Sequence, residues 1–173
     1  IDKTDGMLML FDAAADALGF AIAYHAALAA ALQAAHWVSA NRAEALVLTG
    51  QPDPARAAMA LADRPGGAVV RDGAAGAWLA LQGQAARHVP AHKVAAIDTN
   101  GAGDTHVGAF IAGLAAGHPP EGACQIANIA AALSITKAGP ATAPALTEVM
   151  PLFEVLRRTA RSTDLAPQSE REI

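Results

Sequence analysis

The sequence has few of the residues that build cross-links, nucleic-acid surfaces or metal cages. Cys124 is the single cysteine in 173 residues, which excludes an internal disulfide and a zinc site made of cysteines. Lys and Arg total 12 against 16 Asp and Glu, and they form no basic stripe, so we expect no nucleic-acid partner. Aromatic residues make up only 4% of the chain, whereas 53% is hydrophobic and much of that is alanine. Closely packed helices are the expected result.

The sequence also lacks a long run of strongly apolar residues. Residues 17–41 contain no Asp, Glu, Lys or Arg, but alanine dominates them and His25, Gln33 and His36 interrupt them. Since alanine gains little free energy on entering lipid, we predict a buried helix here and no membrane partner. The start of the sequence shows no secretory leader pattern, and the lone thiol favours a reducing compartment. We therefore expect a cytoplasmic protein.

Short apolar segments alternate with helical ones along the chain. The expected strands are 7–11, 36–40, 68–71, 77–81, 85–89 and 94–97, and the fourth and fifth read as an antiparallel pair. The expected helices are 24–35, 42–48, 55–62, 102–116, 121–137 and 147–160. This alternation predicts an α/β fold with a doubly wound, mainly parallel sheet and helices on both faces. Asn41, Gly73 and Asp98 then follow strands, at the carboxyl edge where such sheets bind ligands.

The most informative segment is Asp98-Thr99-Asn100-Gly101-Ala102-Gly103-Asp104, which lies between an expected strand and an expected helix. Its glycines leave backbone N–H groups unshielded, and the helix dipole adds positive potential, so the turn can hold an anion. Asp104 can accept the proton of a hydroxyl beside that anion, as phosphoryl transfer requires. Taken alone, Gly-x-Gly-Asp fits a helix cap and an ordinary turn equally well. Its spacing matches neither a dinucleotide fingerprint nor a P-loop.

The whole string at residues 98–110, Asp-Thr-Asn-Gly-Ala-Gly-Asp-Thr-His-Val-Gly-Ala-Phe, closely resembles the second signature of the ribokinase-like (PfkB) family of carbohydrate and nucleoside kinases. The resemblance extends over most of the chain. It implies a ribokinase-like fold and transfer of the γ-phosphate of ATP to a hydroxyl of a sugar or related small molecule. It also implies that Asp104 is the base and that the amides of Gly101, Ala102 and Gly103 form the anion hole.

Two further elements resemble the nucleotide site of that family. Asn41 and Glu44 match an Asn-x-x-Glu element, in which Asn lies near the nucleotide phosphates and Glu organises Mg²⁺ through water. From the residues alone, Asn41 is equally a helix cap and Glu44 a solvated acid in the first turn. Asn128 matches a position near adenine, although a helical Asn also bonds neighbouring turns.

The run from residue 71 to residue 76 falls where relatives carry a Thr-x-Gly-x-x-Gly turn against the nucleotide. Gly73 and Gly76 match that turn, whereas Arg71 and Asp72 depart from the usual small or apolar residues. From the residues alone, the run is a simple turn between strands. His106 stands where relatives usually have an aromatic residue, and we expect it to pack in or near the core.

A monovalent-cation site is typical of many relatives, and K⁺ is the expected ion. Backbone oxygens beside the anion hole supply most of its ligands, and a bound cation would order the anion-hole loop. The matching positions in this sequence are Asp98, Asn100, Ser134, Lys137, Gly139 and Thr142. The loop after Gly139 is one residue shorter than in ribokinases.

Full-length relatives place a further α/β portion and a small β-sheet lid before the strand expected at 7–11, and that portion carries most acceptor-binding side chains. We expect residues 1–160 to be the nucleotide-binding and catalytic portion and 161–173 to be a disordered tail. The uncovered apolar face favours self-association as a homodimer. Two alternatives stay open: a nucleotide-binding or regulatory module that lacks catalysis, and a vitamin-precursor kinase of related fold.

Overall fold

The computed structural model describes residues 14–139 and 141–164. It divides into two units, residues 1–36 and residues 37–173. The first unit contains α1 (Ala14–Ala34), an alanine-rich helix. The helix predicted at 24–35 is present and begins earlier, but the prediction that it is buried is wrong, since Ile22 and Tyr24 are 63% and 53% exposed. The strand predicted at 7–11 lies outside the described residues. Within the described part of the chain, no helix combines the length and apolar character needed to cross a membrane.

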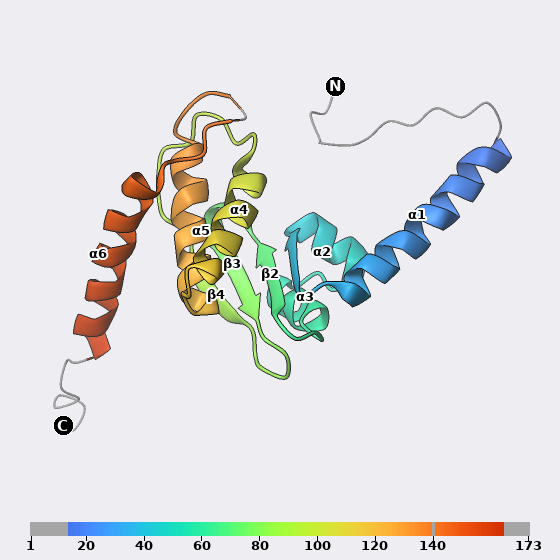
Figure 1. The fold of residues 1–173 in the computed structure, drawn as a ribbon, viewed down its shortest axis with the longest axis horizontal. Coiled ribbons are helices and arrows are strands. Elements are labelled where there is room, and N and C mark those ends of the chain that lie inside the picture. The colour runs from blue at the N-terminus through green and yellow to red at the C-terminus, as the bar shows by residue number, and fades with distance from the viewer. Residues whose placement is uncertain (1–13, 140, 165–173) are drawn as a thin grey trace. The chain divides into compact units, whose positions relative to one another are not determined.

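The second unit is built on one sheet (Figure 1). Its strands β1 (Trp37–Asn41), β2 (Gly67–Arg71), β3 (Gly76–Ala80) and β4 (Arg87–Pro90) lie side by side in chain order. β1 and β2 pair in parallel, whereas β2 with β3 and β3 with β4 pair antiparallel. Short turns join the later strands, and only antiparallel neighbours can be joined that way. The described sheet is therefore mixed, and four of the predicted strands are confirmed.

The strand predicted at 94–97 is wrong. Residues 91–97 are irregular, and Ile97 is 69% exposed. The N–H groups of Ile97 and Asp98 donate to the carbonyl of Ile135, at 2.7 and 3.2 Å, and not to a strand. Ala95 and Ala96 bury too little apolar surface to hold this segment against the sheet.

Helices cover both faces of the sheet. On one face, Val69, Leu79 and Val89 form a core with Phe110 of α4 (Ala102–Ala115) and Ala127 of α5 (Pro120–Ser134). The intervening strand residues face the other way, as the pleat requires. Of these, Ala68, Val70 and Ala80 are fully buried, and α3 (Pro54–Leu61) packs on β2 and β3. The predicted arrangement of helices on both faces is confirmed.

Two remaining helices flank this core. α2 (Arg42–Thr49) follows β1 directly and ends at Gly50, whose φ of 68° suits glycine. α6 (Leu146–Asp164) packs on α5 through Val149 and Phe153. Because α6 continues to residue 164, the tail predicted at 161–173 starts too early. Residues 165–173 lie outside the described residues.

The contact between α4 and α5 depends on a glycine. A Cβ built on Gly113 would lie 3.0 Å from both the Cα and the Cβ of Ala123, whereas one on Gly108, in the same helix, would meet nothing within 4 Å. The two helices therefore approach at Gly113 as closely as their backbones allow. Gly108 faces open space.

We expect Gly113→Ala to lower the free energy of unfolding by about 1–3 kcal/mol, because the added methyl group forces the two helices apart. Gly108→Ala is the matched control and should raise that free energy by up to about 1 kcal/mol, since alanine favours the helix. Urea denaturation of both variants measures the difference. Equal effects of the two substitutions would contradict this account of the contact.

Candidate functional site

The carboxyl ends of β1 and β2 bring two of the predicted site residues together. The parallel register pairs Asn41 with Arg71. Asn41 also caps α2: its side-chain oxygen accepts from the N–H of Glu44, and Oε2 of Glu44 accepts from the N–H of Asn41, both at 2.8 Å. The interpretation of Asn41 as a helix cap is confirmed. Among the described residues, Oε1 of Glu44 has no hydrogen-bond partner, and the side chain is 54% exposed.

Arg71 links this strand end to the glycine-rich turn. Its Nη1 donates to the carbonyl oxygen of Gly103 at 3.0 Å, and its Nη2 lies 3.5 Å from Oε2 of Glu44. The Arg71 side chain is only 17% exposed. Next to it, Arg42 and Asp72 form an ion pair at 3.4 Å. Three segments far apart in the sequence, at residues 41–44, 71–72 and 101–104, therefore meet at one edge of the sheet.

The glycine-rich turn presents open N–H groups. Gly101 caps α4 with a φ of 75°, a conformation that glycine adopts without strain. The first helical bond runs from the N–H of Thr105 to Gly101, and the N–H of Ala102 donates to Thr99 at a long 3.3 Å. Within the described residues, the N–H groups of Gly101, Gly103 and Asp104 donate to no protein acceptor. Of the three amides predicted to form the anion hole, those of Gly101 and Gly103 are open and that of Asp104 joins them, whereas that of Ala102 is not open, because it donates to Thr99.

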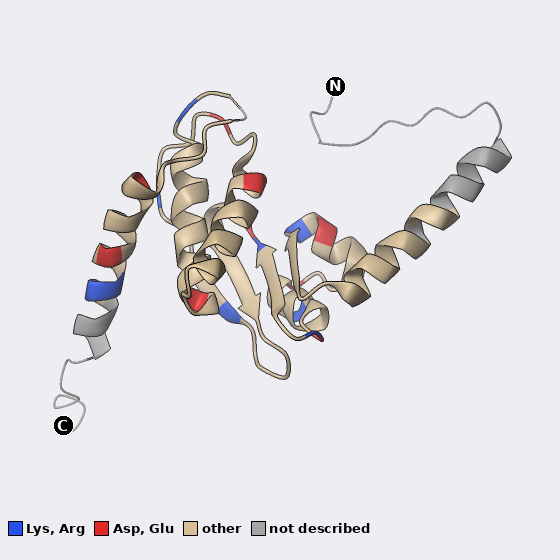
Figure 2. Ribbon diagram, viewed as in Figure 1, with Lys and Arg blue, Asp and Glu red and all other residues tan. Residues whose placement is uncertain are grey.

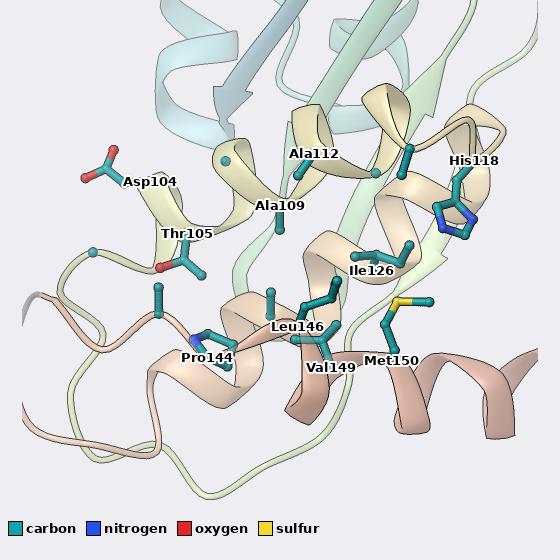
Figure 3. A pocket seen from close by; sticks show the side chains of 16 residues that line it. Asp104, Thr105, Ala109, Ala112, His118, Ile126, Pro144, Leu146, Val149 and Met150 are labelled. Carbon is teal, nitrogen blue, oxygen red and sulfur yellow. The ribbon is translucent and has the colours of Figure 1, made fainter.

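Asp104 stands exposed in the first turn of α4. It lies at one end of a cleft of about 640 Å³ that runs along α4 between α5 and the start of α6. Figure 3 shows its carboxylate pointing away from the apolar lining, which includes Ala109, Ile126 and Val149. The carboxylate is thus open to an incoming hydroxyl.

Charged residues are few on α4 and α5, whereas α6 carries both acidic and basic residues (Figure 2). Asp104 is the acidic residue in the first turn of α4. The other charged residues that meet at the strand ends are Arg42, Glu44, Arg71 and Asp72. The charges close to the glycine-rich turn include those of Asp98, of Asp104 and of the strand-end group.

Asn128 lies in the interior, away from Asp104. Its amide nitrogen donates to the carbonyls of Val89 and Pro90, at 2.9 and 3.0 Å, and its oxygen lies 3.1 Å from Nε2 of His106. Asn128 is only 7% exposed. Because both N–H groups and the oxygen of its amide have partners, the side chain ties α5 to β4 and α4. These bonds fit the alternative reading of the sequence, in which a helical Asn bonds a neighbouring segment. A role for Asn128 near adenine stays a prediction.

His106 is buried, as expected. Since the amide of Asn128 donates to two carbonyls, its oxygen must accept, and Nε2 of His106 carries the proton. Nδ1 is then a bare acceptor, and it has no hydrogen-bond partner among the described residues. Burial, together with the positive charge of Arg71, lowers the pKa of His106 to about 4. The ring is therefore neutral near pH 7.

The positions expected to hold a monovalent cation lie in two loops that are tied together. The carboxylate of Asp98 accepts from the N–H of Asn100 and from that of Gly139, both at 3.0 Å. The hydroxyl of Thr142 donates to the carbonyl of Ser134 at 2.7 Å and lies 3.4 Å from that of Gly139.

Lys137 lies in the second of these loops, and its ammonium group turns away to Glu148, at 3.5 Å. An ammonium group has no lone pair, so only the carbonyl of Lys137 could face a cation. The structure brings these oxygen-bearing residues into one region beside the turn at residues 98–101.

The two matching glycines of the 71–76 run have different surroundings. A Cβ on Gly76 would lie 2.3 Å from the carbonyl oxygen of Val89, so Gly76 is required for β3 to pair with β4. Gly73, with a φ of 56°, faces open space. Of these two positions, only Gly73 leaves room for a ligand.

The sequence did not reveal the long-range bonds of this site. Arg71 is 32 residues from Gly103, and Asn128 is 39 residues from Val89. The one available signal was the presence of a charged side chain at Arg71, where the resemblance leads one to expect a small residue.

An α/β sheet whose strand ends meet a glycine-rich turn at a helix N-terminus defines a class of proteins that bind phosphate groups. The comparison with known families is more specific. The chain belongs to the pfkB family of carbohydrate kinases, whose family model matches residues 8–147. The family resemblance of the sequence and its ribokinase-like α/β fold are confirmed.

Individual relatives agree with this family. The chain is 34% identical over 110 residues to the bifunctional protein HldE of Caulobacter sp. strain K31, a match covering 59% of this chain and 22% of that protein. The ribokinase of Thermotoga maritima is 30% identical with a TM-score of 0.63, over 71% of this chain and 43% of its own. The ribokinase of Arabidopsis thaliana, solved with ribose and ATP, is 28% identical with a TM-score of 0.63, over 71% and 42%. The chain spans less than half the length of these relatives.

We expect the buried, neutral His106 to make the protein sensitive to acid. Its folded pKa of about 4 lies below the ordinary 6.5, so the unfolded chain takes up the proton first as the pH falls. The stabilisation is fully present above pH 6.5 and should decline by up to about 3 kcal/mol between pH 6.5 and pH 4. His106→Phe should flatten the dependence of the unfolding free energy on pH in this window. Identical pH dependence in urea denaturation of both proteins would refute the assignment.

Proposed function

We propose that this chain carries the nucleotide-binding and catalytic portion of an ATP-dependent kinase for a small-molecule hydroxyl. The observation that carries the proposal is the N-terminus of α4, where open N–H groups adjoin an exposed carboxylate. A transferring phosphoryl group needs donors for its oxygens and an acceptor for the hydroxyl proton. This turn supplies both.

The residues divide the reaction between them. The acceptor hydroxyl gives its proton to the carboxylate of Asp104, and its oxygen forms a bond to the γ-phosphorus while the bond from that phosphorus to the leaving ADP oxygen breaks. The N–H groups of Gly101, Gly103 and Asp104 donate to the phosphoryl oxygens as negative charge redistributes. The dipole of α4 adds to this stabilisation.

ATP-dependent kinases of this kind use Mg²⁺, which neutralises the charge of the ATP phosphates when it is bound. The described residues contain no group of three His, Cys, Asp or Glu side chains arranged to hold a metal. Glu44 nevertheless fits a contact through water, because its Oε1 has no partner and its side chain is half exposed. Glu44 would thus hold a water ligand of the ion, and Asn41 fixes Glu44 by the capping box.

Two relatives support this assignment. An E. coli protein of this fold, 27% identical with a TM-score of 0.67 over 81% of this chain and 44% of its own, was solved in complex with ATP and Mg²⁺. The Arabidopsis ribokinase was solved with ribose and ATP. A sugar or nucleoside-like alcohol is therefore the proposed acceptor class.

We expect Asp104→Asn, in the native-length protein, to lower kcat by about 10²–10⁴-fold, because the amide cannot accept the hydroxyl proton. The affinity for ATP should change little. Glu121→Gln is the matched control, since Glu121 is also an acid in the first turn of a helix. ADP release measures turnover, and titration calorimetry measures ATP binding.

Normal turnover by the Asp104→Asn protein would show that another group is the base. ATP binding without ADP release by the unaltered protein, across a panel of sugars and nucleosides, would favour the regulatory module. Turnover of a vitamin precursor in place of a sugar would favour the second alternative.

We also propose that K⁺ binds among the oxygens of the 98–100 and 134–142 loops and orders the turn before α4. Turnover in KCl should then exceed turnover in tetramethylammonium chloride at equal ionic strength, because the large cation cannot enter a cage of backbone oxygens. Thr142→Val, which removes the hydroxyl that holds Ser134 and Gly139, should reduce the difference. Equal turnover in the two salts would exclude a bound K⁺.

A further inference from the structure

Arg71 holds a position in the site that the proposed reaction does not yet explain. We propose that Arg71 binds the terminal phosphate of the nucleotide, and that its contacts with Glu44 and Gly103 are a resting position from which it turns to that phosphate. This inference rests on the proposed kinase function and assigns a residue to its phosphate subsite.

The guanidinium lies against the turn that holds the phosphate. Its Nη1 donates to the carbonyl of Gly103, and a Cβ on Gly103 would lie only 3.3 Å from Nη1. Gly103 also carries one of the open N–H groups. A phosphate that accepts from this N–H is therefore within reach of a small rotation of the Arg71 side chain.

The electrostatic surroundings favour an anion beside Arg71. The positive end of the α4 dipole disfavours a cation in this place. The ion pair with Glu44 offsets this only weakly, since its 3.5 Å separation is at the limit of a hydrogen bond and Glu44 is 54% exposed. An anion between the guanidinium and the open N–H groups would be attracted by both.

The guanidinium also has donors to spare. Its five N–H groups form a planar fork that matches phosphate oxygens. In the part of the chain that the structure describes, its hydrogen bonds go to Gly103 and Glu44 alone. Because Glu44 and Asp104 are acidic, a polyanionic nucleotide needs a nearby positive charge. The neighbouring Arg42 is 62% exposed and pairs with Asp72, which leaves Arg71 to supply that charge.

The test compares Arg71→Gln with Arg87→Gln in the native-length protein. Titration calorimetry gives the affinities for ATP and AMP, and thermal unfolding gives the rise in Tm that each nucleotide causes. Arg71→Gln should weaken ATP binding by about 10–100-fold, the loss expected for charge-assisted hydrogen bonds, and AMP binding by less than about 3-fold. The ATP-induced rise in Tm should shrink accordingly. Arg87→Gln should leave both affinities unchanged, because Arg87 is also paired with an acid, Glu121, but lies outside the site.

An unchanged ratio of ATP to AMP affinity in Arg71→Gln would overturn the inference and leave Arg71 as a structural link. If this variant does not fold, Arg71→Lys decides, because it keeps the charge but loses the fork: its ratio should fall by several-fold, and an unchanged ratio again overturns the inference. Failure of the unaltered protein to bind ATP would instead contradict the proposed kinase function itself.

Discussion

The parallel pairing of β1 with β2 is the constraint on which the site depends. It sets Asn41 beside Arg71 at the carboxyl edge of the sheet. Asn41 then starts α2 and fixes Glu44, while Arg71 reaches Gly103 in the first turn of α4. A shift of one residue in this register would turn Arg71 to the opposite face of the sheet. The anion-binding turn would then lose its link to the strand ends.

Glycine suits the turn before α4 for two separate reasons. Gly101 has a φ of 75°, which side chains with a Cβ rarely adopt, and this conformation starts the helix with its N–H groups open. Gly103 has no such backbone constraint, but a Cβ there would press on the guanidinium of Arg71. Backbone conformation favours glycine at position 101, and the contact with Arg71 favours glycine at position 103. Together they account for the Gly-x-Gly pattern.

The local parts of this structure could be predicted from the sequence. Asn41 marked the start of α2, and short apolar segments marked the strands, because both signals act over a few residues. The strand prediction at 94–97 was wrong because its alanines offer too little apolar surface to decide between a strand and a loop. The pairing of Arg71 with Gly103 could not be predicted, since it depends on how the sheet and α4 pack.

The neutral state of His106 matters for the charge of the site. A protonated imidazole here would add a second positive charge near that of Arg71. The amide of Asn128, held by two carbonyls of β4, accepts the Nε2–H of His106 and so sets which ring nitrogen carries the proton, although this bond raises the pKa of His106. Burial lowers the pKa of His106 to about 4. The core of α4 is therefore uncharged near pH 7, and the positive charge of Arg71 acts on the turn at residues 101–104.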